Sequence, residues 1–319
     1  MTVAVAAAAH RPAMRFPPLP CDARPIGARV ETSVETSVGT SVGALVGALV
    51  GLGLVVSTPL PAQRLEGSVT ATVASGDYLF TRAVTSYALV GGLTLAAERW
   101  RLGLEVPLVR QDASAVAWVA GMPIPVGGPE AGRLRDRVGE TALPLAPDAY
   151  RTTLADPTFT AGTDLALTDD GSVRIGVAGA VKLPAAGVET GVGTGATDVG
   201  LAGHWSAMGN RSFAVVDVGY WWLGDLPDLP LDDLVTGRLT MGRTFGEMGR
   251  LSVMLRWEAA SAPVPQVDPR YGVGVGVGIA VARDESVTVA VDRGTSETAP
   301  DWRVTMRWRH GVRAGGWGR

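Results

Sequence analysis

Residues 271–282 read YGVGVGVGIAVA, and this stretch decides the fold class. Large apolar residues alternate here with glycine or alanine. Because successive side chains of a β-strand point to opposite faces, the pattern predicts a strand with one apolar face and one face of small residues. Residues 251–258 and 302–309 alternate in the same way, with mostly polar residues on the second face. These strands would separate an oily environment from a polar one.

The same alternation predicts about twelve strands along the chain. They are expected at 66–75, 84–97, 100–111, 157–168, 172–183, 197–207, 211–223, 235–245, 250–260, 271–282, 286–293 and 301–310. Most are close to the 9–11 residues that a tilted transmembrane strand needs, whereas strands of globular proteins average about 5–6. The predicted strands are therefore long enough to cross a membrane.

The predicted connections alternate between short and long. Tight turns are expected at 98–100, 169–171, 208–210, 246–249 and 283–285, and longer links at 76–83, 112–156, 184–196, 224–234, 261–270 and 294–300. Membrane barrels have short periplasmic turns and longer extracellular loops. The sequence thus predicts an all-β, antiparallel transmembrane β-barrel of about twelve strands. The even number of strands places both chain termini on the periplasmic side. A soluble β-sandwich also shows alternation and is the competing fold.

The composition agrees with a barrel whose outer surface is apolar. Charged residues make up 18% of the chain, against about 25% in ordinary domains, and its 42 glycines in 319 residues are about twice the usual share. The net charge of −3 gives no sign of the basic surface that binds nucleic acid.

The N-terminal region predicts export. Residues 42–56 are apolar and uncharged, which suits a signal peptide but is short for a membrane helix of about 20 residues, the alternative. We expect cleavage after Ala62, so that 1–62 form an export signal with an extended N-terminal region, 63–310 the outer-membrane barrel and 311–319 a tail. The only cysteine, Cys21, precedes this point, so the mature chain would have no disulfide.

Charged residues on the second face of the strands would line the lumen. They are Arg101, Glu105, Asp164, Arg174, Lys182, Asp198, His204, Asp217, Arg238, Arg256, Glu258, Arg303, Arg307 and Arg309. Both signs occur, so no strong ion selectivity is expected. Barrels of eight strands have an interior filled by side chains, and barrels of 16–18 strands enclose an aqueous channel. Twelve strands lie between these sizes, so the sequence is compatible with either a narrow pore or a closed, salt-bridged lumen. The glycines of 271–282 are expected to widen the lumen locally, and Arg243 falls on the lipid-facing side near a strand end.

No catalytic, metal or cofactor site is expected. The glycine-rich residues 191–195 precede a strand rather than the helix N-terminus that a phosphate-binding loop needs. His204 and His310 are too far apart in sequence for a zinc cluster. A phospholipase-like barrel enzyme is a third alternative, because His204 and Ser206 share a strand face, but no third group is evident to orient the histidine. We interpret His204 as a polar lumen residue.

Residues 181–205 resemble a stretch in outer-membrane proteins of the phenol-degradation meta-pathway type. In that family a strand ends in a Leu-Pro turn, a glycine-rich loop follows, and Gly-Thr-Gly-x-x-Asp opens the next strand. The matching residues are Leu183, Pro184, Gly193, Thr194, Gly195 and Asp198. Residues 102–108, LGLEVPL, are similar to a strand of the same family, and the resemblance covers roughly 90–225.

The resemblance implies a monomeric outer-membrane barrel that moves small hydrophobic or aromatic compounds, without catalytic residues to carry over. The sequence departs from the family pattern at two places. Ala185-Ala186 stand where the family has Thr-Gly, and residues 311–319 follow the last predicted strand, so the chain does not end on a strand-terminal aromatic residue. The second departure weakens the usual signal for the barrel-assembly machinery. The expected partners are outer-membrane lipid, that machinery and an unidentified small solute. The expected function is a passive channel or transporter; the alternative is a structural or surface-interaction barrel with a closed lumen, in which the 112–156 loop acts.

Overall fold

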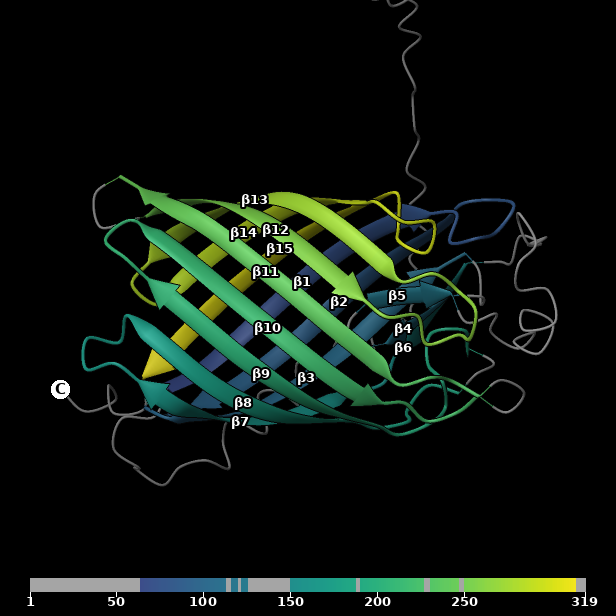
Figure 1. The fold of residues 1–319 in the computed structure, drawn as a ribbon, viewed down its shortest axis with the longest axis horizontal. Coiled ribbons are helices and arrows are strands. Elements are labelled where there is room, and N and C mark those ends of the chain that lie inside the picture. The colour runs from purple at the N-terminus through teal and green to yellow at the C-terminus, as the bar shows by residue number, and fades with distance from the viewer. Residues whose placement is uncertain are drawn as a thin grey trace, which may run out of the picture. The chain divides into compact units, whose positions relative to one another are not determined.

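Twelve long strands form one closed antiparallel barrel (Figure 1). The computed structural model describes residues 64–112, 116–119, 122–125, 150–187, 190–226, 230–246 and 250–313. The barrel strands are β1 (Arg64–Gly76), β2 (Val84–Ala96), β3 (Trp100–Gln111), β7 (Thr158–Leu167), β8 (Val173–Lys182), β9 (Asp198–Met208), β10 (Ser212–Trp222), β11 (Leu234–Phe245), β12 (Leu251–Ala260), β13 (Arg270–Ala282), β14 (Glu285–Gly294) and β15 (Trp302–Arg313). The predicted fold class is confirmed, and each strand boundary lies within three residues of its predicted position.

The first and last strands close the ring. β1 pairs with β15 from Arg64↔Arg313 to Ser75↔Trp302, and its other side pairs with β2. β3 in turn pairs with β2 and β7, so every barrel strand has two neighbours. Closure matters because an unpaired backbone group in hydrocarbon costs several kcal/mol.

Short and long connections alternate, as predicted. The turns at 97–99, 168–172, 209–211 and 283–284 lie at one end of the barrel, which we call the short-turn end and which is on the left in Figure 1. The links at 77–83, 261–269 and 295–301 and the described residues of 183–197 lie at the opposite, long-loop end. β1 begins and β15 finishes at the short-turn end, because the number of strands is even.

The outer face of the barrel is apolar. Leu255, Val275 and Val277 are 60%, 56% and 43% exposed, and similar side chains stand on the same face of nearly every strand. In a β-sandwich these residues would be buried between two sheets. The sandwich alternative is therefore wrong: one sheet closes on itself, and its apolar side faces outward.

The long segment between β3 and β7 contains strands that the sequence did not predict. β4 (Val116–Val119) and β5 (Met122–Pro125) form a separate two-stranded hairpin, and β6 (Arg151–Leu154) pairs with the end of β3. β7 pairs with β3 only over Trp100–Glu105, because β6 takes its place beyond that point.

Several sequence-based predictions lie outside the described residues. These are the export signal, its cleavage after Ala62, Cys21 and the chain beyond Arg313. β15 continues three residues past its predicted end at 310. Within the described residues, no helix has the length and apolar character needed to cross a membrane.

Candidate functional site: the polar lumen

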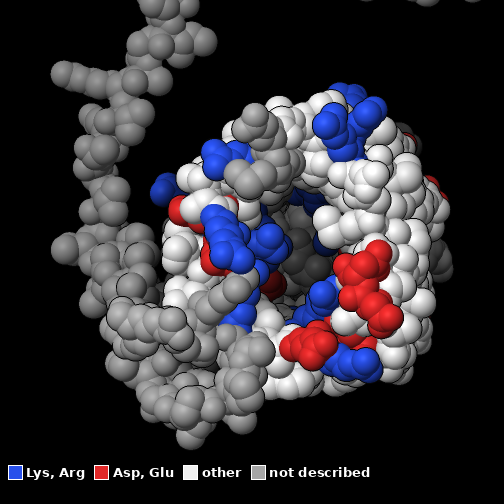
Figure 2. Space-filling view, turned by 90° about the vertical axis from the view of Figure 1, so that its left-hand side faces the viewer, with Lys and Arg blue, Asp and Glu red and all other residues white. Residues whose placement is uncertain are grey.

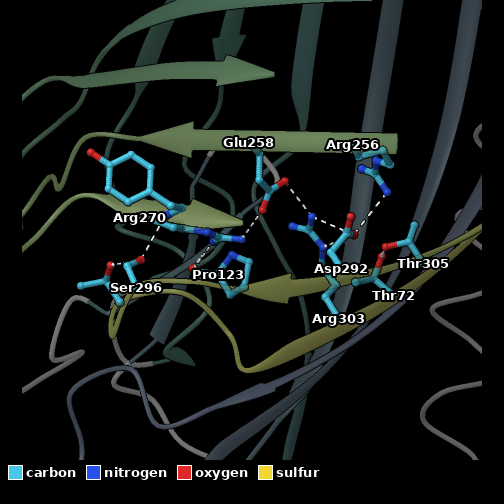
Figure 3. Close-up of polar contacts among 11 residues, drawn as sticks. Thr72, Pro123, Arg256, Glu258, Arg270, Asp292, Ser296, Arg303 and Thr305 are labelled. Carbon is cyan, nitrogen blue, oxygen red and sulfur yellow. Dashed lines mark hydrogen bonds and ion pairs between the residues drawn. The ribbon is translucent and has the colours of Figure 1, made fainter. Parts of the chain in front are cut away.

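A cluster of five charged side chains lies on the inner face of β12–β15, toward the long-loop end (Figure 3). This mouth cluster consists of Arg256, Glu258, Arg270, Asp292 and Arg303. Arg303 Nη2 lies 2.7 Å from Glu258 Oε2 and 3.0 Å from Asp292 Oδ2. The other arginines flank this centre: Arg256 Nη1 donates to Asp292 Oδ2 at 3.2 Å and Arg270 Nη2 to Glu258 Oε1 at 2.9 Å.

The glycines of β13 make room for this cluster. Gly274 pairs with Arg256 on one side and with Asp292 on the other, so the ion pair between β12 and β14 crosses over it. A methyl group added at Gly274 would overlap Asp292 Oδ1, and one at Gly276 would lie 3.0 Å from Met254 Cγ. The expectation that these glycines widen the lumen is therefore wrong, because side chains of the neighbouring strands cover them.

The mouth cluster is almost completely withdrawn from solvent. Glu258, Arg270, Asp292 and Arg303 are 4–8% exposed. Buried charges are tolerated only when oppositely charged partners compensate for lost hydration, and every member of the cluster has such a partner. Three guanidinium groups face two carboxylates, so the cluster carries one net positive charge.

The β4–β5 hairpin, which we call the strap, lies across the lumen. At one side Gln111 Nε2, on β3, donates to Val116 O at 2.7 Å; at the other side Arg270 Nη1, on β13, donates to Pro123 O at 2.7 Å. Strands β3 and β13 stand on opposite sides of the ring, since four strands separate them one way and six the other. A hairpin bound to both must span the interior near the long-loop end.

Apolar contacts hold the same hairpin against the β2–β3 wall. Trp118 is 8% exposed and belongs to a buried group with Ala88, Val109 and Val192. Its backbone N–H donates to Val192 O at 3.2 Å. The strap thus narrows the lumen rather than extending away from the barrel, whereas β6 extends the barrel wall beside β3.

A second buried group, the loop cluster, comprises Asp156, Lys182, Thr194 and Asp198. Lys182 Nζ lies 2.8 Å from Asp156 Oδ2, 2.9 Å from Thr194 Oγ1 and 2.9 Å from Asp198 Oδ2. Asp156 also accepts from two backbone N–H groups of the next long loop, and Asp198 accepts from Gly224 N at 3.0 Å. Residues that carry the family resemblance, Thr194 and Asp198, therefore tie three long loops together.

Two further groups involve predicted lumen residues nearer the short-turn end. Asp164 is bound by Arg101 at 2.6 Å and by Arg174 at 3.0 Å. His204 Nδ1 lies 2.7 Å from Asp217 Oδ1 on the neighbouring strand. Among the described residues, no hydrogen bond joins a serine to His204, so a serine–histidine nucleophile is not assembled there.

The other predicted residues are exposed on the inner face. Arg309 Nε lies 3.5 Å from Glu66 Oε1. Glu105, Arg238 and Arg307 are exposed, and within the described part of the chain no ion pair joins them to another side chain. Arg243 has the outward parity expected for it, with its guanidinium 6.0 Å from the ring centre of Phe245.

Sequence reasoning missed Arg270, Asp292 and Gln111. Asp292 shares the inner parity of Ser286 and Thr288, so the alternation of β14 could have identified it. Arg270 precedes the predicted start of its strand by one residue. The role of Gln111 depends on the strap, which had no sequence signal.

No family model and no curated protein sequence matches this chain. Among solved structures, an outer membrane channel from Pseudomonas putida F1 is similar over 79% of this chain and 97% of its own, with a TM-score of 0.57 and 13% identity. The NanC porin covers 77% of this chain and 98% of its own at 9% identity and a TM-score of 0.45. The P. putida toluene transporter TodX covers 80% and 91% at 11% identity and a TM-score of 0.41. At 13% identity, the likeness to the P. putida channel shows the fold alone, a closed antiparallel β-barrel.

Proposed function

We propose that this chain is a bacterial outer-membrane channel through which small solutes pass passively. The observation that carries the proposal is a closed barrel with an apolar outer face and charged, partly exposed side chains on its inner face. In this orientation the long loops face the outside and the short turns the periplasm. Export through a signal cleaved after Ala62 belongs to the same proposal.

The two ends of the barrel differ in how open they are. Figure 2 shows the short-turn end hollowed, with both Lys or Arg and Asp or Glu side chains around the opening. At the long-loop end the strap and the mouth cluster occupy part of the lumen. These features favour small solutes over large ones. The meta-pathway resemblance adds small hydrophobic or aromatic compounds as the solute class to test first.

Single-channel recording tests this function. The refolded full-length protein is inserted into planar bilayers, and small, uniform conductance steps are expected. The folded state of the same preparation is verified by its faster migration on an unboiled gel. A preparation that is folded by this criterion and produces no steps would contradict the channel.

The strap supports a second candidate, a barrel with a closed lumen that presents its long loops to a partner. In that case deletion of the 112–156 segment would abolish binding of the partner while conductance stayed absent in both proteins. For the channel, the same deletion is expected to raise conductance.

A further inference from the structure

The inner-face charges are distributed unevenly around the ring. The described inner faces of β11–β15 carry six arginines and only two carboxylates, which are those of the mouth cluster. The excess is four positive charges. The six are Arg238, Arg256, Arg270, Arg303, Arg307 and Arg309. The other seven barrel strands carry four cations and five carboxylates on their described inner faces.

Burial increases this asymmetry. The side chains of Asp164, Asp198 and Asp292 are only 1%, 1% and 7% exposed, because cations lie over them. By contrast, the arginines at the edges of these groups remain accessible: Arg101 is 45% exposed and Arg174 is 41% exposed. A solute in the lumen therefore meets guanidinium groups more often than carboxylates.

Two exposed arginines of the inner face take part in no ion pair among the described residues. Arg307 pairs across the strands with Thr70 and Thr288. Arg238 lies opposite Asp217 and Glu258. However, Asp217 is bound to His204, and Glu258 is bound to two arginines of the mouth cluster. No ion pair joins either of them to a carboxylate among the described residues. A guanidinium presents several N–H donors in a planar fork that matches the two oxygens of a carboxylate.

From these observations we infer that the lumen prefers small anions, and that Arg238 and Arg307 are the residues that determine this preference. The inference rests on the proposed channel function and narrows its solute class to molecules that bear a carboxylate or a comparable oxyanion. The sequence analysis expected no strong ion selectivity because both signs occur in the lumen, and it could not show which acids are covered. A concentrated positive field in a confined space raises the local concentration of anions.

Reversal potentials under a KCl gradient test the preference in the full-length protein. Chloride is expected to permeate better than potassium. In R238Q/R307Q the chloride-to-potassium permeability ratio should fall at least about five-fold, because one unit charge at about 4 Å in water changes the local chloride concentration by about that factor and the variant removes two charges. Arg243→Gln is the matched control, because it removes an arginine from the outer face, and its ratio should equal that of the wild type. Potassium preference in the wild type, or an unchanged ratio in R238Q/R307Q, would overturn the inference.

A second measurement does not depend on conductance. Phenylglyoxal labelling of arginines, read by mass spectrometry, should show that acetate protects Arg238 and Arg307 but not Arg243. Equal labelling with and without acetate would overturn anion binding. A barrel that conducts without anion preference contradicts this inference alone, whereas a folded barrel with acetate protection and no conductance contradicts the channel function alone.

Discussion

Gly274 lies on β13 between Arg256 of β12 and Asp292 of β14, and the ion pair between their side chains crosses it at 3.2 Å. A side chain at this position would occupy the space that the carboxylate fills. At the scale of single residues, the absence of a side chain therefore sets the arrangement of charges as much as the arginines do.

Gly274→Ala should lower the free energy of unfolding by about 1–3 kcal/mol, since overpacking a filled site forces its neighbours to move. The measurement is urea unfolding in lipid vesicles, followed by tryptophan fluorescence. Gly203→Ala is the control: a methyl group there would have no atom within 4 Å, and we expect a change within about 0.5 kcal/mol. Equal losses in the two variants would contradict the packing explanation.

Asp170 orders the turn between β7 and β8. Its carboxylate accepts from Ser172 N at 2.9 Å and Thr168 Oγ1 at 2.7 Å, and these hydrogen bonds lower its pKa from 3.8 to about 2. Because the pKa falls on folding, the ionised group stabilises the turn above about pH 4, and this stabilisation disappears as the pH drops toward about 2.

Asp170→Asn should remove that pH dependence. In the wild type, hydrogen exchange of the Ser172 backbone amide should become faster between about pH 4 and pH 2, as Asp170 is protonated. In the variant this increase should be absent, because the asparagine side chain does not titrate. Parallel exchange profiles of the two proteins over this interval would show that the carboxylate does not hold the turn.

The strap is the element whose position matters most for passage. It is held by Gln111 on one wall and by Arg270 on the opposite wall, and both bonds end on backbone carbonyls. Arg270 also binds Glu258, so one side chain connects the strap to the mouth cluster.

Arg270→Met should release this side of the strap and increase the single-channel conductance. The variant also removes one of the buried cationic partners of Glu258. Because breaking a buried ion pair lowers the free energy of unfolding by about 3–5 kcal/mol, the variant should also be less stable. Arg243→Met, on the outer face, serves as the control for loss of an arginine. A smaller or unchanged conductance in a folded Arg270→Met barrel would show that the strap does not limit passage.

The barrel strands could be predicted from sequence because lipid imposes a two-residue alternation on every one of them, as in residues 271–282. The strap could not. Its strands have four residues each, too few for a periodic signal, and Pro123 binds a residue 147 positions away. Likewise, parity identified Arg303 and Glu258 as inner-face residues, but their ion pair depends on glycines of a strand between them.

At the scale of the whole molecule, β15 completes the ring by pairing with β1 and β14. Removing 302–319 would leave both neighbours with unpaired backbone groups, at several kcal/mol each in lipid. We expect this truncation to abolish the faster migration of the unboiled protein. Removing only 314–319 retains all of β15 and should preserve it. Loss of the shift in the shorter truncation would place a folding determinant after the last strand.

The strap also implies an order of events during assembly. Gln111 is synthesised early and lies next to the hairpin in the chain, whereas Arg270, the first residue of β13, is synthesised only after six further barrel strands, β7 to β12. The bond to Gln111 can therefore form before β13 exists, whereas the bond to Arg270 can form only once β13 has joined the barrel. The second anchor of the hairpin is thus among the late contacts of the barrel to form.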